Sequence, residues 1–230
     1  MSAYDPFAVI YDDWSAHMTD DVFWYVELAR QADGPVVELA VGNGRVAVPV
    51  AQAIGRPVVG IDASPAMLDG ARARAEAAGV ELDLRLGDMR DLALEEPAAL
   101  VTCPFRSLLH LPTWADRRRV FERVAANLQP GGRFAWNAFV FSPHIAAGND
   151  GVRQVQNGVG HTVHHHAHDS RLDIVLDTGA TVSLWWVTRS EWEALLDVSG
   201  LETEQLYGGF SREPFGEGSG EFVWVARKPG

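Results

Sequence analysis

One short stretch near the start of the chain carries residue types that suit the binding of a nucleotide-like ligand. Segment 36–45 reads VVELAVGNGR. Its apolar run contains an acidic residue, Glu38, and is followed by two closely spaced glycines. Glycine accepts the positive φ of a tight turn and lets the backbone approach a ligand without an intervening Cβ. Segment 45–55 would then form a helix whose first amide groups point back at that ligand. The spacing predicts a strand, a glycine turn and a helix around one binding site.

A second acid lies where a ribose contact would need it. The apolar run PVVGID ends in Asp62, eighteen residues beyond Gly44. In doubly wound sheets, an acid at this position hydrogen-bonds ribose hydroxyl groups. Together the two segments predict an adenosine-containing cofactor across the carboxyl ends of the first two strands.

Two cofactors fit this description. The residues GNGRVA, 42–47, satisfy the loose GxGxxA form of a dinucleotide fingerprint, which favours a nicotinamide dinucleotide and an oxidoreductase. Glu38 favours another ligand, because a carboxylate that points into the site would repel a pyrophosphate. S-adenosylmethionine (SAM) carries no phosphate and is cationic at sulfur, so it tolerates that charge. The residues favour SAM and leave the dinucleotide as the alternative.

Five segments, taken in order, resemble the class I SAM-dependent methyltransferases. Ala40 stands where the family commonly has the first glycine of its first motif, and the N-terminal YDPFAVIYDDW resembles small-molecule methyltransferases, including those that act on amino sugars. The resemblance implies methyl transfer to oxygen or nitrogen of a small molecule by in-line displacement, with S-adenosylhomocysteine as product. A SAM-binding module without turnover is the other possibility. The five segments are ELAVGNG (38–44), VVGIDASPAML (58–68), LRLGDMRDL (84–92), LVTCPFRSLLHL (100–111) and LQPGGRFAWNAF (128–139).

The same resemblance implies which residues contact the cofactor. Asp62 would bind the ribose, and Met67 would lie beside the adenine. Asp88 would accept a hydrogen bond from the adenine amino group, while Met89 packs on the ring. The full set of expected cofactor contacts is Tyr11, Glu38, Ala40, Gly42, Asn43, Gly44, Asp62, Ala63, Met67, Asp88, Met89 and Cys103.

Methyl transfer from a sulfonium asks little of the protein beyond holding the acceptor in line and excluding water. A base is needed only where the acceptor arrives protonated or weakly nucleophilic. His110 is the catalytic candidate because it follows the fourth strand; its alternative role is to pack in a turn before Pro112. Phe105, Trp136 and His144 are the expected acceptor contacts. Aromatic residues on segments that could surround the methyl group are Trp14, Phe23, Phe105, Trp136, Phe139 and Trp185.

Hydrophobic periodicity predicts an α/β fold with a doubly wound, mostly parallel seven-stranded sheet and a small antiparallel β insertion. Segments 98–105 and 133–140 are continuously apolar, as buried parallel strands are, whereas segment 80–86 alternates and belongs near a sheet edge. We expect one domain over residues 1–230, with an N-terminal lid and helix over 1–33 and the insertion over 150–187. Within the insertion, the expected strands are 156–168, 171–177 and 180–187.

Helix starts are marked by side chains that can cap free amide groups. Thr19, Ser64, Thr113 and Thr188 are the expected N-caps. Pro65 follows Ser64 at the favoured first helical position.

The composition of the chain indicates which partners and which cellular location to expect. The net charge of −12 and the lack of a basic stripe argue against nucleic acid as a partner. A single cysteine, Cys103, cannot form an internal disulfide, which fits a reducing compartment. No segment approaches the roughly 20 apolar residues of a membrane span. These observations predict a cytoplasmic enzyme that acts on a small molecule and leave a homodimer open.

Histidines gather in segment 161–168, where five of the chain's eight occur. On one strand, His164, His166 and His168 would share a face. At strand rise they would spread over about 13 Å, too far to converge on one ion without ligands from elsewhere. The sequence therefore predicts no metal site.

Overall fold

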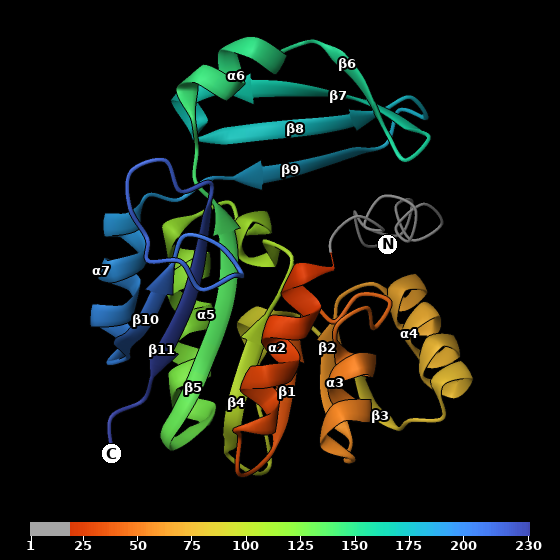
Figure 1. The fold of residues 1–230 in the computed structure, drawn as a ribbon, viewed down its shortest axis with the longest axis vertical. Coiled ribbons are helices and arrows are strands. Elements are labelled where there is room, and N and C mark those ends of the chain that lie inside the picture. Colours follow the sequence, from red (N-terminus) through yellow and green to blue (C-terminus); the bar gives the residue numbers. More distant parts are fainter. Residues whose placement is uncertain (1–18) are drawn as a thin grey trace.

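The computed structural model describes residues 19–230, and its centre is a seven-stranded sheet in the order β10-β11-β5-β4-β1-β2-β3 (Figure 1). Strands β1 to β5 run parallel, and β11 pairs antiparallel with both β5 and β10. The predicted doubly wound, mostly parallel sheet is confirmed. Strand bounds are Val36–Leu39 (β1), Val58–Asp62 (β2), Leu82–Leu86 (β3), Ala98–Cys103 (β4), Leu128–Phe139 (β5), Glu202–Tyr207 (β10) and Glu221–Arg227 (β11).

Helices cover both faces of this sheet, because successive side chains of a strand point to opposite sides. Val36 packs into the apolar cluster under α2, α3 and α4, while Val37 packs into the cluster under α5 and α7. Trp224 and its neighbour Val225 divide between the two clusters in the same way. The helices are Asp20–Arg30 (α2), Ala47–Ile54 (α3), Pro65–Ala78 (α4), Trp114–Asn127 (α5) and Arg189–Ser199 (α7).

Three of the four predicted N-caps are confirmed. The side chains of Ser64 and Thr113 each accept a hydrogen bond from an amide group in the first turn of the helix. Thr188 forms a full capping box with Glu191. Thr19 does precede a helix, but its side chain makes no capping hydrogen bond, so that part of the prediction is wrong.

A second sheet, in the order β6-β7-β8-β9, lies beyond the carboxyl ends of the parallel strands (Figure 1). It has four strands and not three: Arg153–Gln156 (β6), Val159–His166 (β7), Arg171–Leu176 (β8) and Thr181–Trp185 (β9). The predicted strand 156–168 is wrong at its start, because Asn157 and Gly158 both have positive φ and turn the chain into a hairpin. An Asn-Gly pair of this kind is a strong hairpin signal.

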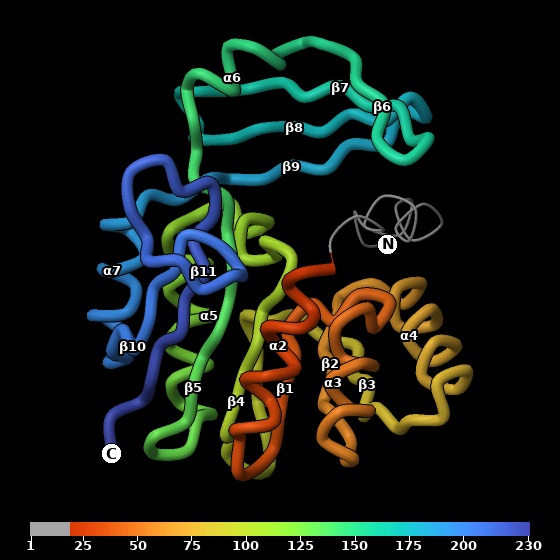
Figure 2. The backbone as a smooth tube through the Cα atoms, in the orientation of Figure 1, coloured from red at the N-terminus to blue at the C-terminus, as the bar shows by residue number. Residues whose placement is uncertain are grey.

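The insertion joins the main sheet at two places. The chain leaves at the end of β5, forms the short helix α6 (Pro143–Asn149), and returns from β9 to α7 (Figure 2). Helix α6 is not among the elements that the sequence predicts. Strand β9 is the edge strand nearest the main sheet, and it contacts η2 (Ser107–His110), the 3-10 turn that follows β4.

The histidine-rich segment does not form one straight row. Strand β7 ends at His166, and His168 lies in the 3-10 turn η3 (Ala167–Asp169), so the predicted common face is wrong. His166 Nε2 lies 2.9 Å from a carboxylate oxygen of Asp173. Over residues 19–230, no cluster of three or more His, Cys, Asp or Glu side chains has an arrangement that could hold a metal ion. In the same range, no helix is long and apolar enough to cross a membrane.

Gly60 in β2 lies close to the side chains of Val41, which follows β1, and Leu84 of β3. A Cβ on Gly60 would stand 2.8 Å from Cγ2 of Val41 and 3.0 Å from Cδ2 of Leu84. We expect Gly60→Ala to lower the free energy of unfolding by about 1–3 kcal/mol, as overpacking does. Unfolding in urea measures this difference in the free energy of unfolding.

Gly148 supplies the matched control for this substitution. It lies in α6, and an added Cβ would meet nothing within 4 Å, so Gly148→Ala should be neutral or stabilise by up to about 1 kcal/mol. Equal losses in the two variants would contradict the packing argument.

Candidate active site

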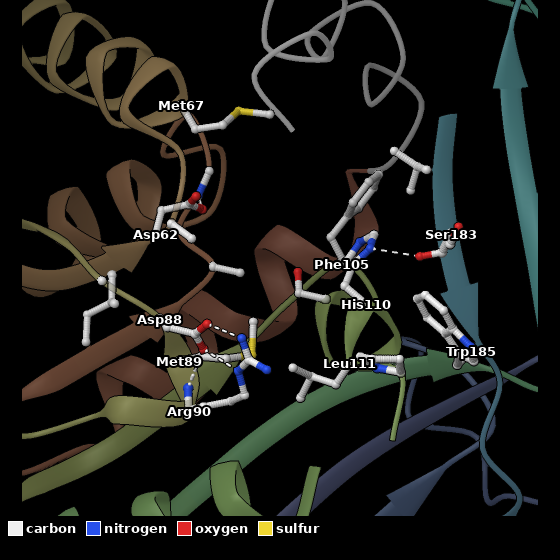
Figure 3. Close-up of a pocket in the computed structure, with 18 of the residues that line it drawn as sticks. Asp62, Met67, Asp88, Met89, Arg90, Phe105, His110, Leu111, Ser183 and Trp185 are labelled. Atoms are coloured by element: carbon white, nitrogen blue, oxygen red, sulfur yellow. Dashed lines mark hydrogen bonds and ion pairs between the residues drawn. The ribbon is translucent and has the colours of Figure 1, made fainter. Parts of the chain in front are cut away.

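A cavity of about 500 Å³ lies at the carboxyl ends of the central strands, with β9 on its far side. Ligands of open α/β sheets bind at this edge. Figure 3 shows Asp62, Met67 and Asp88 on one wall and His110, Ser183 and Trp185 on the other. The predicted site residues that line the cavity are Ala40, Gly42, Asp62, Ala63, Met67, Asp88, Met89, Phe105 and His110.

The Asp62 carboxylate ties the glycine turn to the end of β2. Its Oδ2 accepts a hydrogen bond from the Gly42 N–H at 2.8 Å, and its Oδ1 accepts from the Ser64 N–H at 2.8 Å. Each carboxylate oxygen has a second acceptor position. Asp62 can therefore hold the turn and still accept from the hydroxyl groups of a ribose.

The glycine turn itself runs through positive φ at Ala40, Gly42 and Gly44, with values of 52°, 54° and 77°. Ala40 is a residue with a Cβ in this region, which costs about 1 kcal/mol or more. At Gly44 an added Cβ would stand 3.4 Å from Cβ of Ala71, so this glycine lets α4 pack closely on the turn. The turn therefore takes its shape from both φ and packing.

Asp88 is held in its ionised form by Arg90. The Arg90 guanidinium donates to both carboxylate oxygens, at 3.0 and 2.6 Å, and the Arg90 N–H donates at 2.8 Å. These hydrogen bonds lower the pKa of Asp88 below its ordinary value. Arg90 also donates to Asp116 at 2.7 Å. An ionised Asp88 can accept from the amino group of an adenine, and sequence analysis did not identify Arg90 as its partner.

Glu38 lies behind the glycine turn. Its side chain is only 3% exposed, and burial raises its pKa well above the ordinary value, although the nearby Arg45 lowers it in part. The Ala47 N–H, at the start of α3, donates to its carboxylate. Arg45 makes a bidentate ion pair with the buried Asp21, at 2.8 and 2.5 Å. Among the described residues, Glu38 is not one of those that line the cavity, so its contact with a cofactor stays a prediction.

His110 is fixed in one tautomer by the inserted sheet. Its Nδ1 lies 3.2 Å from the main-chain oxygen of Ser183 in β9, and a carbonyl oxygen can only accept. Nδ1 therefore carries the hydrogen, and Nε2 carries a lone pair. Burial lowers the pKa of His110 to about 4, so the ring is neutral at pH 7. This His can accept a hydrogen bond from an acceptor group, but it is a weak base.

Aromatic rings line the half of the cavity that contains His110. Among the described members of the predicted aromatic set, Phe105, from the turn after β4, and Trp185, from β9, lie there. Thr181 and Ser183 of β9 also line it, and sequence analysis missed both because nothing local shows that the insertion reaches this edge. Of the other predicted rings, Phe23 is 67% exposed on α2.

Two predicted acceptor contacts, Trp136 and His144, are not among the described residues that line the cavity. The Trp136 ring is fully buried in the core, stacked on Trp224 with centroids 5.6 Å apart, so no ligand can reach it. His144 lies exposed on α6 and does not line the cavity. The sequence placed Trp136 on the correct strand but could not give the face on which its side chain lies.

The remaining predicted contacts are not decided by this geometry. Cys103 is fully buried in β4, where burial raises the pKa of its thiol, and Asn43 and Gly44 lie in the turn behind the lining residues. Tyr11 and Trp14 lie outside the described residues. The cofactor contacts of Cys103, Asn43 and Gly44 therefore stay predictions.

The residues on the Asp62 wall fit an adenosine-containing cofactor. Asp62 offers acceptor positions for the ribose, and Asp88 offers an ionised carboxylate for an adenine amino group. Met67 and Met89 supply apolar contacts between them. At Gly42 the turn lines the cavity without a Cβ, so its backbone could approach a bound cofactor closely.

Comparisons with known proteins agree with this geometry. A family model described as "Methyltransferase domain" matches residues 36–132. A dTDP-3-amino-3,6-dideoxy-alpha-D-glucopyranose N,N-dimethyltransferase of Streptomyces fradiae is 30% identical, over 76% of this chain and 72% of that protein. A 27-O-demethylrifamycin SV methyltransferase of Amycolatopsis mediterranei is 28% identical, over 88% of this chain and 80% of that protein. The CcbJ methyltransferase structure from Streptomyces caelestis superposes with a TM-score of 0.80 at 26% identity, over 97% and 96% of the two chains.

The strand order, the position of the cavity and these relatives point to one family. They indicate a methyltransferase rather than a nicotinamide-dependent oxidoreductase or a SAM-binding module without turnover, and they confirm SAM as the cofactor. The chain belongs to the class I SAM-dependent methyltransferases.

Proposed function

We propose that the enzyme transfers the methyl group of SAM to an amine nitrogen of a small molecule. The relatives support a small acceptor: by name, the Streptomyces fradiae protein acts on an amino sugar nucleotide and the Amycolatopsis mediterranei protein on a rifamycin. The resemblance of segment 4–14 to small-molecule methyltransferases supports the same class. The choice of nitrogen rests on the charge of the cavity.

The cavity carries negative charge and offers little to an anionic acceptor. Asp62 and Asp88 line it, and among the described lining residues the one Lys or Arg is Arg90, which is bound to Asp88 and Asp116. Segment 1–18 contains neither Lys nor Arg, so it cannot add such a cation wherever it lies. A carboxylate or phosphate would lose its hydration here without gaining a partner. A neutral amine suits these walls, and this charge balance is the observation that carries the proposal.

The residues on the His110 wall would orient such an amine. Nε2 of His110 can accept from an N–H of the acceptor, which leaves the nitrogen lone pair to point across the cavity. Bound SAM supplies a methyl group activated by its sulfonium. Phe105 and Trp185 restrict the acceptor and exclude water, which raises the effective concentration of the nucleophile. The nitrogen lone pair forms the new bond to carbon as the carbon–sulfur bond breaks, and the proton leaves the methylated nitrogen to solvent.

Methylation of a hydroxyl oxygen is the second candidate, and His110 itself favours it. An alcohol is a weak nucleophile until a base removes its proton, and His110 lies at the acceptor wall with a lone pair on Nε2. The low pKa of His110, about 4, weakens this role because the ring would hold that proton poorly. Nitrogen is therefore the better supported acceptor.

Other properties of the protein belong to the same proposal. A cytoplasmic location follows from the single cysteine and from the use of a small-molecule cofactor. The organisation of residues 1–230 as one domain and a homodimeric state are further expectations. Neither nucleic acid nor membrane is needed as a partner.

Matched acceptors test the proposed function. Purified enzyme is incubated with methyl-labelled SAM and pairs of small molecules without carboxylate or phosphate groups that differ only in an amino or a hydroxyl group, including an amino sugar and its hydroxy counterpart. We expect label on the amino member of a pair and at least about a hundredfold less on the hydroxy member. Label on the hydroxy members alone would establish the oxygen acceptor instead.

The substitution His110→Ala tests whether His110 only orients the acceptor or also removes a proton from it. Loss of one hydrogen bond to the acceptor should lower kcat about tenfold, or about 1.4 kcal/mol. The dissociation constant of S-adenosylhomocysteine should not change, because Asp62 and Asp88 are intact. A fall in kcat of about 10²-fold or more would show that His110 acts as a general base.

The same variant has a defined effect on stability at low pH. Burial lowers the pKa of His110 from 6.5 to about 4, so the unfolded chain binds a proton between these values that the folded chain does not. Stability from this group is present above pH 6.5 and is lost as pH falls. The free energy of unfolding should therefore fall more steeply in the wild type than in His110→Ala over that range, measured by urea unfolding. Parallel curves would contradict the burial of a neutral ring.

Gly42→Val tests the position of the cofactor. A branched side chain at φ 54° would be strained and would face the ligand, so the affinity for S-adenosylhomocysteine should fall about a hundredfold by calorimetry. Gly55→Val is the control, because Gly55 has φ 64° with nothing within 4 Å and lies at the far end of α3. Equal loss of affinity in both variants would place the cofactor elsewhere.

A further inference from the structure

The turn after β4 contains two successive residues in a conformation that side chains disfavour. Phe105 has φ 56° and Arg106 has φ 62°, although neither is glycine. In this region the Cβ of an L-residue crowds the following carbonyl oxygen. Such a backbone persists where its surroundings over-determine it, and such sites are enriched where function needs a fixed geometry. Phe105 lines the cavity, so what holds this turn also places the Phe105 ring.

Arg106 is held by an ion pair that lies outside the cavity. Its guanidinium donates to both carboxylate oxygens of Glu221, Nε to Oε1 at 3.1 Å and Nη2 to Oε2 at 2.7 Å. Two parallel hydrogen bonds of this kind fix orientation as well as distance. Glu221 is the first residue of β11 and pairs in register with Phe139 of β5, whose ring centroid lies 5.6 Å from the Arg106 guanidinium. The turn is thus fastened to the antiparallel side of the main sheet.

Glu221 is in turn fixed by a buried chain of hydrogen bonds. Asn137 of β5 is fully buried, and its Nδ2 donates to Glu221 Oε1 at 2.7 Å. Tyr25 of α2 is also fully buried, and its hydroxyl donates to Asn137 Oδ1 at 3.1 Å. Burial raises the pKa of Tyr25, so the hydroxyl keeps the hydrogen that this bond requires. Helix α2, strand β5 and strand β11 therefore set the position of one carboxylate.

A second ion pair, between Arg45 and Asp21, also contacts the turn. The Arg45 guanidinium carbon lies 4.8 Å from the centroid of the Phe105 ring, and Arg45 is bound to the buried Asp21. A guanidinium over an aromatic face is attractive. Arg45 thus contacts the ring of Phe105, while Arg106 holds the backbone of the turn that contains Phe105.

We propose that Glu221 is a positioning residue for methyl transfer, which acts through Arg106 to hold the left-handed turn and so sets Phe105 at the acceptor side of the cavity. The proposal rests on the proposed function in one respect, the assignment of the Phe105 side to the acceptor. It assigns a role in turnover to a residue that does not touch the cavity.

The isosteric variant Glu221→Gln removes the charge while an oxygen remains that can accept from Asn137. Methyl transfer is measured with SAM and an acceptor that the wild type methylates. We expect kcat to fall about tenfold, with the dissociation constant of S-adenosylhomocysteine and the melting temperature close to the wild-type values. Glu221→Asp, which keeps the charge, should recover part of the loss. Arg106→Lys should lose as much as Glu221→Gln, and the double variant should lose no more, because both changes break one interaction.

Glu204→Gln is the matched control. Glu204 of β10 makes a bidentate ion pair with Arg133 of β5 at 2.9 and 2.6 Å, with side-chain exposures of 22% and 31%, against 12% and 37% for Glu221 and Arg106. Arg133 lies in the middle of β5, six residues before Phe139, and it does not line the cavity. Loss of the ion pair between Glu204 and Arg133 should leave kcat within twofold of the wild type. An equal fall in both variants would show general loosening of the sheet and overturn the proposal.

Hydrogen exchange gives a readout that needs no acceptor, so failure of this proposal and failure of the proposed function are distinguishable. Amide exchange of segment 104–111, measured by mass spectrometry, should be about tenfold faster in Glu221→Gln and unchanged in Glu204→Gln. Unchanged exchange in Glu221→Gln would overturn the positioning role even where the enzyme methylates amines. Faster exchange without any amine methylation in the wild type would uphold the clamp on the turn and reject the acceptor assignment.

Discussion

The Asp62 carboxylate is the interaction on which the site depends. It joins the glycine turn after β1 to the start of α4 by accepting from the amide groups of Gly42 and Ser64. A single side chain thus fixes the separation of these two elements. Because a carboxylate oxygen can accept more than one hydrogen bond, binding of a ribose by Asp62, as the sequence predicts, is compatible with this role in the fold. Ser64 caps α4 through its side chain, so the start of that helix is fixed by two hydrogen bonds that converge at one residue.

Burial gives the acids of this region different protonation behaviour. Asp88 is partly exposed and bound to Arg90, which lowers its pKa, whereas desolvation raises the pKa of Glu38. Opposite shifts in two carboxyl groups are expected where one has a guanidinium partner at hydrogen-bond distance and the other is mainly desolvated. A cation bound near Glu38 would favour its ionised form.

The sequence was informative where local patterns determine structure. The glycine turn, Asp62 and the caps at Ser64 and Thr188 follow from φ preferences and short-range hydrogen bonds, and the structure has them where the pattern put them. Trp136 shows the limit of that reasoning. Its strand was predicted correctly, yet in a parallel strand buried on both faces the pattern is continuously apolar and does not tell which face a side chain takes. The contacts from Thr181 and Ser183 were out of reach for a second reason, since they depend on how the insertion packs against the main sheet.

The inserted sheet is part of the site because of the way an edge strand presents its backbone. On either side of β9, the Ala180 carbonyl accepts from the Leu176 N–H and the Trp186 N–H donates to the Ser170 carbonyl, so the even-numbered residues pair with the β8 side. The Ser183 carbonyl has the opposite parity and points outward, where His110 donates to it. An edge strand leaves alternate peptide groups directed away from its sheet. The tautomer of His110 is thus set by a main-chain atom that no exchange of the Ser183 side chain removes, and the catalytic candidate from the main sheet has its ring defined only when the insertion is in place.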